Sequence, residues 1–215
     1  MRENYLPAIA RGIMVMLAIA VAAYSSRYYG VLDKAWYGID PKIKAVILQA
    51  PLPALLHMLI APVALALGPF QFYPGFRMRH PKLHRWSGRV YVVACIVAGV
   101  GALATAPFAS GGSRAGLGFG LLAVLWIGTT AAAWILAVRR SFVRHRLLMR
   151  FSYAMTFAAV VLRVQIPIGF ALGYESYSSM SPVLAFSSWI PNVVIVALYS
   201  TWQSWRHSRS GENRL

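Results

Sequence analysis

The sequence predicts an all-α integral membrane bundle of six transmembrane helices. Of its 215 residues, 59% are hydrophobic and only 12% are charged, and the mean hydropathy is +0.59. Soluble domains carry about 25% charged residues. The apolar residues fall in blocks that match the roughly 20 residues a helix needs to cross a bilayer. Composition and block length therefore indicate one transmembrane domain covering residues 1–215.

Six apolar blocks give the expected helices, which cover residues 8–25, 46–72, 89–108, 117–138, 147–174 and 183–205. We expect the second to fifth helices to form the core. Prolines inside the second block favour kinks, because each proline removes a backbone hydrogen bond. Residues 206–215 are polar and predict a mobile cytoplasmic tail.

The net charge of +16 comes from Lys and Arg in short segments between the apolar blocks. Two of these segments, residues 77–91 and 139–146, are read as basic loops. Loops of this kind face the cytoplasm and contact anionic lipid headgroups. The distribution therefore predicts a bacterial inner (plasma) membrane protein with both termini in the cytoplasm, bound to anionic lipid and not to nucleic acid. We read the first apolar block as a retained helix and not as a cleaved signal peptide.

The two basic segments also resemble each other. His84 is followed by Arg89, and His145 is followed by Arg150 at the same spacing. This similarity is explained either by a parallel repeat of helix pairs or by chance.

Arg163 lies deep in the fifth apolar block, where a charge costs about 3 kcal/mol on insertion scales. All five acidic residues lie outside the apolar blocks. Arg163 is therefore expected to meet backbone carbonyls and water, Glu175 near the outer face, or a bound carboxylate, phosphate or haem propionate. His57, in the second block, is expected at a similar depth. It is either a neutral structural histidine or a member of the same polar pocket.

His84 and His145 are expected near the cytoplasmic boundary, and His145 shares a helix face with Arg163, because eighteen residues make five turns. Facing histidines are the usual axial ligands of a b-type haem, with arginines such as Arg85 and Arg89 near the propionates. The alternatives are contact with lipid phosphate, a structural role and another ligand. A histidine-only metal site would be weak.

Part of the chain resembles a widespread bacterial family of predicted multi-pass membrane proteins of unknown function. The resemblance rests on His57, Gly68-Pro69-Phe70-Gln71-Phe72, Arg79, Leu83-His84-Arg85-Trp86-Ser87-Gly88-Arg89-Val90-Tyr91, His145-Arg146, Met149-Arg150, Thr156-Phe157-Ala158-Ala159 and Leu162-Arg163. It spans residues 50 to 170 and implies a multi-pass membrane protein. The motifs are also loosely similar to cytochrome b561-type and ferric-reductase-like membrane cytochromes. That similarity implies haem held by paired histidines, although His57 has no evident histidine partner at its depth.

Three functions follow as hypotheses. The first is a membrane redox protein that binds one b-type haem or a quinone-like ligand through His57, His84, His145 and Arg163. The second is a protein that binds or transports an anionic small molecule or lipid, and the third is a structural or regulatory subunit. The sequence does not decide whether the protein is an enzyme; a catalytic role would be that of a membrane oxidoreductase. It has no Gly-rich phosphate loop and no hydrolase motif, and its single cysteine, Cys95, excludes a disulfide framework.

Overall fold

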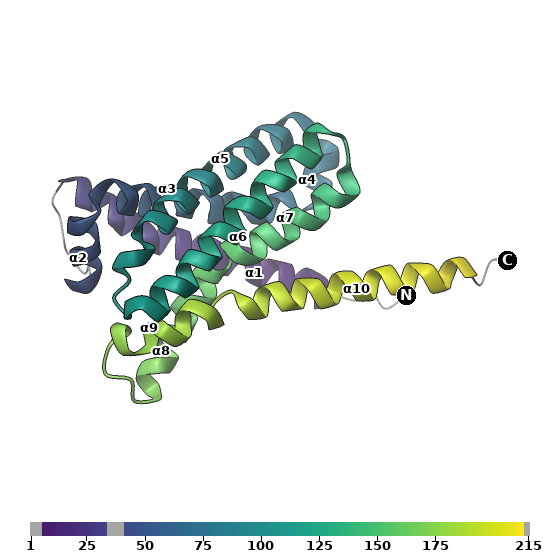
Figure 1. Ribbon diagram of the computed structural model, residues 1–215. Coiled ribbons are helices and arrows are strands. Elements are labelled where there is room, and N and C mark those ends of the chain that lie inside the picture. Colours follow the sequence, from purple (N-terminus) through teal and green to yellow (C-terminus); the bar gives the residue numbers. More distant parts are fainter. Residues whose placement is uncertain (1–5, 34–40, 213–215) are drawn as a thin grey trace.

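The computed structural model describes residues 6–33 and 41–212. This part of the chain consists of helices joined by short irregular segments and contains no strand. Six segments are long and apolar enough to cross a membrane: Ile9–Gly30, Pro51–Gln71, Pro81–Phe108, Gly112–Val138, Phe142–Ala171 and Tyr177–Arg206. The predicted all-α bundle of six spans is therefore confirmed. Figure 1 shows the long helices packed together, with the yellow C-terminal helix extending away from the others.

The helices do not all coincide with the spans. The elements are α1 (Leu6–Ser25), the 3-10 helix η1 (Ser26–Asp33), α2 (Pro41–Gln49), α3 (Pro51–Gln71), α4 (Pro74–Arg79), α5 (Pro81–Thr105), the 3-10 helix η2 (Ala106–Phe108), α6 (Gly112–Val138), α7 (Phe142–Thr156), α8 (Ala158–Ala171), α9 (Tyr177–Ser187) and α10 (Ile190–Glu212).

The core lies between α3, α5, α6 and α7, as predicted for the second to fifth spans. Its buried residues are Ala64, Tyr91, Ala94, Cys95, Ala98, Trp126, Ala133, Met149, Tyr153 and Met155. Small residues dominate because helices attract one another in lipid through close packing, and small side chains allow the backbones to approach. Gly101 of α5 shows how close this approach is, since a Cβ there would lie 2.5 Å from the carbonyl oxygen of Pro53 on α3.

The two basic segments are mostly helical, with breaks at residue 80 and at residues 139–141, which corrects their interpretation as loops. α5 begins at Pro81 and not at residue 89, and α7 begins at Phe142 and not at residue 147. Proline is favoured in the first helical turn, where its missing N–H costs nothing, so Pro81 suits the start of α5. α6 similarly begins at Gly112 and not at residue 117. The pattern of charges predicts where a segment lies relative to a membrane, but it does not predict whether the segment is helical.

Three of the predicted helices are interrupted. The second is divided at Ala50, whose backbone leaves the helical region before Pro51, and the fifth is divided at Phe157. The sixth is divided at Ser188 and Trp189, just before Pro191. Pro191 has no N–H for the carbonyl of Ser187, four residues earlier. That carbonyl instead accepts a hydrogen bond of 3.3 Å from Nε2 of Gln165 on α8, so a neighbouring helix satisfies the backbone.

The chain continues in helical form beyond the predicted sixth helix. α10 runs to Glu212, so residues 206–212 are helical where a polar tail was predicted. Residues 213–215 of that predicted tail lie outside the described residues. α10 packs on α7 and α9, and its far end extends past the bundle on the same side as the start of α1 (Figure 1).

Asn192 of α10 joins the two interruptions in the fifth and sixth spans. Its Nδ2 donates to the carbonyl of Ala154 at 3.1 Å, three residues before Phe157, and to the carbonyl of Ser188 at 3.1 Å. Asn192→Leu should therefore lower the free energy of unfolding by about 1–2 kcal/mol, because both carbonyls lose their amide donor. Thermal unfolding of the purified protein measures this loss.

Thr201→Val is the control for that substitution. Thr201 also lies on α10, but its hydroxyl bonds only to carbonyls of its own helix. The two variants should differ, and equal melting temperatures would contradict the role given to Asn192.

Candidate functional site

The signature around His84 joins the end of α3 to the start of α5. Nε2 of Gln71 donates to Oγ of Ser87 at 2.7 Å. A Cβ on Gly88 would lie 3.3 Å from Oε1 of Gln71. Gly68 leaves still less room for a side chain, because a Cβ there would lie 2.1 Å from the ring of Tyr153 on α7. These motif residues therefore hold the helices together.

A cavity of about 310 Å³ lies in the other half of the bundle. Its walls come from the end of α1, the first half of α3, the end of α5, the first half of α6, and α8 and α9. The basic segments lie at the opposite ends of α3, α5, α6 and α7, toward α4 in Figure 1. Ligand pockets measure roughly 300–1,000 Å³ and are mostly apolar with a few polar groups. This cavity has that character, with polar lining residues Ser25, His57, Thr105, Arg163, Ser181 and Ser188 among apolar ones such as Leu65, Phe119, Leu122 and Trp126.

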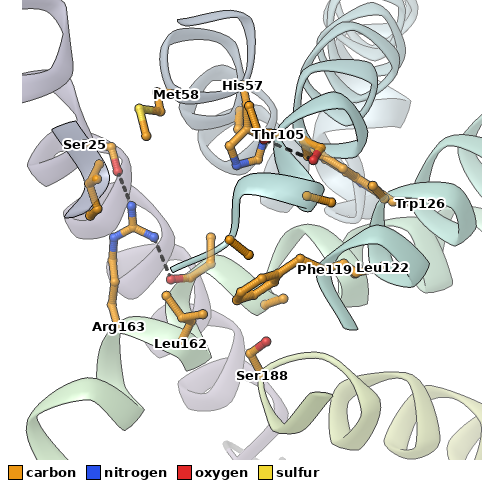
Figure 2. Close-up of a pocket in the computed structure, with 18 of the residues that line it drawn as sticks. Ser25, His57, Met58, Thr105, Phe119, Leu122, Trp126, Leu162, Arg163 and Ser188 are labelled. Carbon is orange, nitrogen blue, oxygen red and sulfur yellow. Dashed lines mark hydrogen bonds between the residues drawn. The ribbon is translucent and has the colours of Figure 1, made fainter. Parts of the chain in front are cut away.

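Arg163 is the permanent charge of the cavity. Its Nη1 donates to the carbonyl of Ala159 at 2.9 Å, and its Nη2 donates to Oγ of Ser25 at 3.0 Å. Ser25 in turn donates to the carbonyl of Val21 at 2.8 Å, which fixes its oxygen as an acceptor. A guanidinium has five N–H donors. These contacts position Arg163 and leave donors for a ligand (Figure 2).

His57 lies on a neighbouring wall, and the structure brings it together with Arg163 as predicted from their depth. Both residues line the cavity, and their charges are close enough to interact. Nδ1 of His57 lies 3.0 Å from the carbonyl oxygen of Ala98. A carbonyl only accepts, so Nδ1 carries the hydrogen and Nε2 of the neutral ring can accept from a ligand.

Arg163 has a second arginine in its neighbourhood. Arg27, at the start of η1, is close enough for its charge to act on Arg163. Glu175 is the one acidic residue whose side chain the structure describes; it is exposed and does not line the cavity. Of the partners expected for Arg163, the structure shows a backbone carbonyl, that of Ala159, together with Ser25, and does not show Glu175. A positive cavity without a described carboxylate favours an anionic ligand.

A network of buried hydroxyls lies behind the cavity. The Tyr91 hydroxyl is 3.0 Å from both Ser152 and Thr156, and Thr130 is 2.6 Å from Ser152. Nε1 of Trp126 donates to Thr156 at 2.9 Å. Sequence reasoning missed Thr130 and Trp126, because an apolar run gives no signal for one paired threonine. Fully paired networks of this kind rigidify a core.

His84 and His145 form a separate pair near the basic segments. Each is the fourth residue of its helix, and their charges are close enough to interact. Nδ1 of His145 donates to the carbonyl of Ala133 at 2.8 Å. Nδ1 of His84 is buried and has no partner among the described residues.

The four residues predicted for one haem site thus lie in two pairs. His57 and Gln71 both lie on α3, fourteen residues or roughly 20 Å apart. Gln71 bonds to Ser87 on α5, which is one turn from His84. His57 and His84 are therefore far apart. The axial nitrogens of one iron are only a few ångströms apart. His57 therefore cannot share an iron with His84, whereas His84 and His145 have the residue type that binds haem iron and lie at the same end of the bundle.

The remaining predicted residues lie on the surface. Arg85 and Arg89 are exposed, and the guanidinium carbon of Arg89 is 5.5 Å from the centre of the Trp86 ring. Within residues 6–33 and 41–212, no group of three or more His, Cys, Asp or Glu side chains could hold a metal ion. Arg85 and Arg89 suit contact with lipid phosphate, as a basic surface next to a span does.

Comparison with known proteins gives one match. A family model described as "Predicted membrane protein (DUF2306)" matches residues 54–200. The matched segment covers more than half of the chain and includes all the predicted site residues. No curated protein and no solved structure matches the chain.

Proposed function

The chain belongs to the DUF2306 family of predicted membrane proteins, and within that family we propose that it binds and moves a small amphipathic anion through the cavity around Arg163. The ligand would place a carboxylate or phosphate against the guanidinium and an apolar body against Leu65, Phe119 and Leu122.

The observation that carries this proposal is the unneutralised charge of Arg163. A cation inside a membrane protein is normally paired, and it marks a ligand or ion pathway when it is not. Arg163 contacts only a carbonyl and a serine among the described residues. A bound anion would supply the missing charge and would form the stronger, charge-assisted kind of hydrogen bond.

Movement of the ligand is supported by the interrupted helices beside the cavity. Thr156 and Ala158 line it on either side of the interruption at Phe157, and Ser188 lines it at the interruption between α9 and α10. Transporters build substrate sites from discontinuous helices, because such helices offer backbone polar groups and points of flexure. These features favour transport over a purely structural role.

The experiment compares dodecanoate with dodecanol, which share an apolar chain and differ in charge. Purified protein in detergent should be stabilised thermally by dodecanoate and not by dodecanol, with native mass spectrometry counting the bound molecules. Dodecyl phosphate tests whether the site prefers phosphate. Equal stabilisation by the acid and the alcohol would sink the proposal, because the charge of Arg163 would then play no part.

A second candidate function is one-electron transfer with a b-type haem held by His84 and His145. It is favoured by their equivalent positions in the first turns of α5 and α7 and by the Ala133 carbonyl, which accepts from Nδ1 of His145 and leaves Nε2 as the ligating nitrogen. Backbone carbonyls orient metal-ligating histidines in this way.

The haem proposal predicts a spectrum. Protein expressed with sufficient haem should show a Soret band, and a sharp α-band should appear on reduction with dithionite. His84→Ala and His145→Ala should each abolish the α-band, whereas His57→Ala should leave it unchanged. A protein without these bands, or bands that survive both alanine substitutions, would exclude this pair as haem ligands.

A further inference from the structure

Ser181 of α9 and Ser188, the residue directly after α9, stand out among the hydroxyl groups of the bundle. Oγ of Ser181 and Oγ of Ser188 are buried and have no hydrogen-bond partner among the described residues. The side chains are 0% and 1% exposed, and both line the cavity. Figure 2 shows Ser188 across the cavity from Ser25 and His57, with Phe119 between them.

Several hydroxyls in these helices are satisfied by their own backbone. A helical serine or threonine commonly donates to the carbonyl four residues earlier. The donors that do so here are Ser25, Ser87, Thr105, Thr156, Thr201 and Ser204. Ser181 and Ser188 have not made this bond, although a buried hydroxyl without a partner costs free energy. Such a cost is accepted where the partner arrives from outside the chain.

The spacing of the two serines suits one ligand. They are seven residues apart, which is two helical turns and about 10 Å. The backbone of Ser188 keeps helical angles at the C-cap of α9, so the two serines lie on the same side. Arg163 and Ser25 occupy another wall, and the space between is apolar (Figure 2). The cavity thus has one cationic group, Arg163, and on a different wall two neutral hydroxyl donors, Ser181 and Ser188.

We infer that Ser181 and Ser188 form a second polar subsite, which takes oxygen acceptors on the ligand at a distance from its anionic group. The ligand class is then an amphipathic anion whose apolar chain carries a second oxygen-bearing group, such as an ester or amide carbonyl. A simple fatty acid would satisfy Arg163 and leave the serines unpaired. This inference rests on the proposed function and adds the ligand's second polar group to it.

The test uses two probes of equal chain length. Dodecanoate ends in a methyl group, whereas the monomethyl ester of decanedioate carries an ester at the same end. The wild-type protein should bind the monoester about tenfold more tightly, since each added hydrogen bond is worth a few-fold in affinity. Shorter and longer homologues of both probes find the chain length that fits.

The double variant Ser181→Ala, Ser188→Ala should lose this preference and bind the two probes equally. Its melting temperature without ligand should stay the same or rise, because two unpaired buried hydroxyls are removed. Ser200→Ala is the matched control. Oγ of Ser200 is also buried and without a partner among the described residues, but Ser200 does not line the cavity.

The outcomes separate the two proposals. If the wild-type protein binds both probes equally at every chain length, the serine subsite is overturned and the anion site of Arg163 still stands. The two hydroxyls would then bond to ordered water. A preference that persists in the double variant would overturn it as well. Failure of every anionic probe to bind would overturn the proposed function and the subsite with it.

Discussion

Arg163→Gln is expected to weaken the binding of an anionic amphiphile by roughly 30- to 150-fold, the equivalent of about 2–3 kcal/mol for a charge-assisted hydrogen bond. Glutamine is shorter and neutral, so it keeps donor groups but loses the charge that the ligand needs. The measurement is thermal stabilisation by dodecanoate across a concentration series.

The same substitution should leave the fold intact. Within the described residues no carboxylate loses a partner, since Arg163 bonds to Ala159 and Ser25. Removal of a charge from the interior of a membrane protein also lifts a cost of about 3 kcal/mol on insertion scales. The melting temperature without ligand should therefore not fall by more than a few degrees.

Arg150→Gln is the matched control, because it makes the same change of charge on α7. Arg150 bonds to Gln203 and lies outside the cavity. Its substitution should leave dodecanoate binding unchanged. If both variants bind as the wild-type protein does, Arg163 is a structural arginine and the anion site does not exist.

Gly101→Ala should destabilise the protein by about 3 kcal/mol, at the upper end of the range for overpacking. A Cβ at this position would lie 2.5 Å from the carbonyl oxygen of Pro53 and 2.8 Å from the backbone nitrogen of His57. Both are backbone atoms of α3, so no side-chain rotation relieves the contact. α3 and α5 would have to separate at the level of His57, which would also distort the cavity.

Gly128→Ala serves as the control for this prediction. A Cβ on Gly128 meets nothing within 4 Å, and alanine is a better helix former than glycine by about 1 kcal/mol. Its melting temperature should be equal to that of the wild-type protein or higher, whereas that of Gly101→Ala should fall by roughly 10 °C. Similar values for the two variants would show that α3 and α5 are not in backbone contact.

Much of the fold was predictable from the sequence because a bilayer leaves few choices. Apolar blocks of sufficient length must be helical, since lipid offers no partner for backbone polar groups. The second to fifth blocks were likewise predicted to form the core, and α3, α5, α6 and α7 supply its buried residues. The starts of α5 and α7 were not predictable in this way, because basic side chains are compatible with both a loop and a helix at a membrane surface.

The candidate site was predictable only in part. Depth along the helices put His57 and Arg163 at one level, and the structure places both in one cavity. Depth could not reveal Ser25 as the partner of Arg163, because 138 residues separate the two and their contact depends on how α1 is rotated against α8. It also could not show that Ser181 and Ser188 lack partners, since a serine in an apolar run usually bonds to its own helix.

The sequence by itself determined that this protein has six apolar spans, two basic segments between them and one deep cation without a carboxylate at its depth. Helix length and hydrophobicity fix these features residue by residue, without reference to neighbours. The tertiary structure alone decided that the predicted site residues form two pairs, with Arg163 and His57 at a cavity and His84 and His145 at the basic end. Helical periodicity gives the face on which a side chain lies, but only the packing and rotation of the helices decide which faces meet.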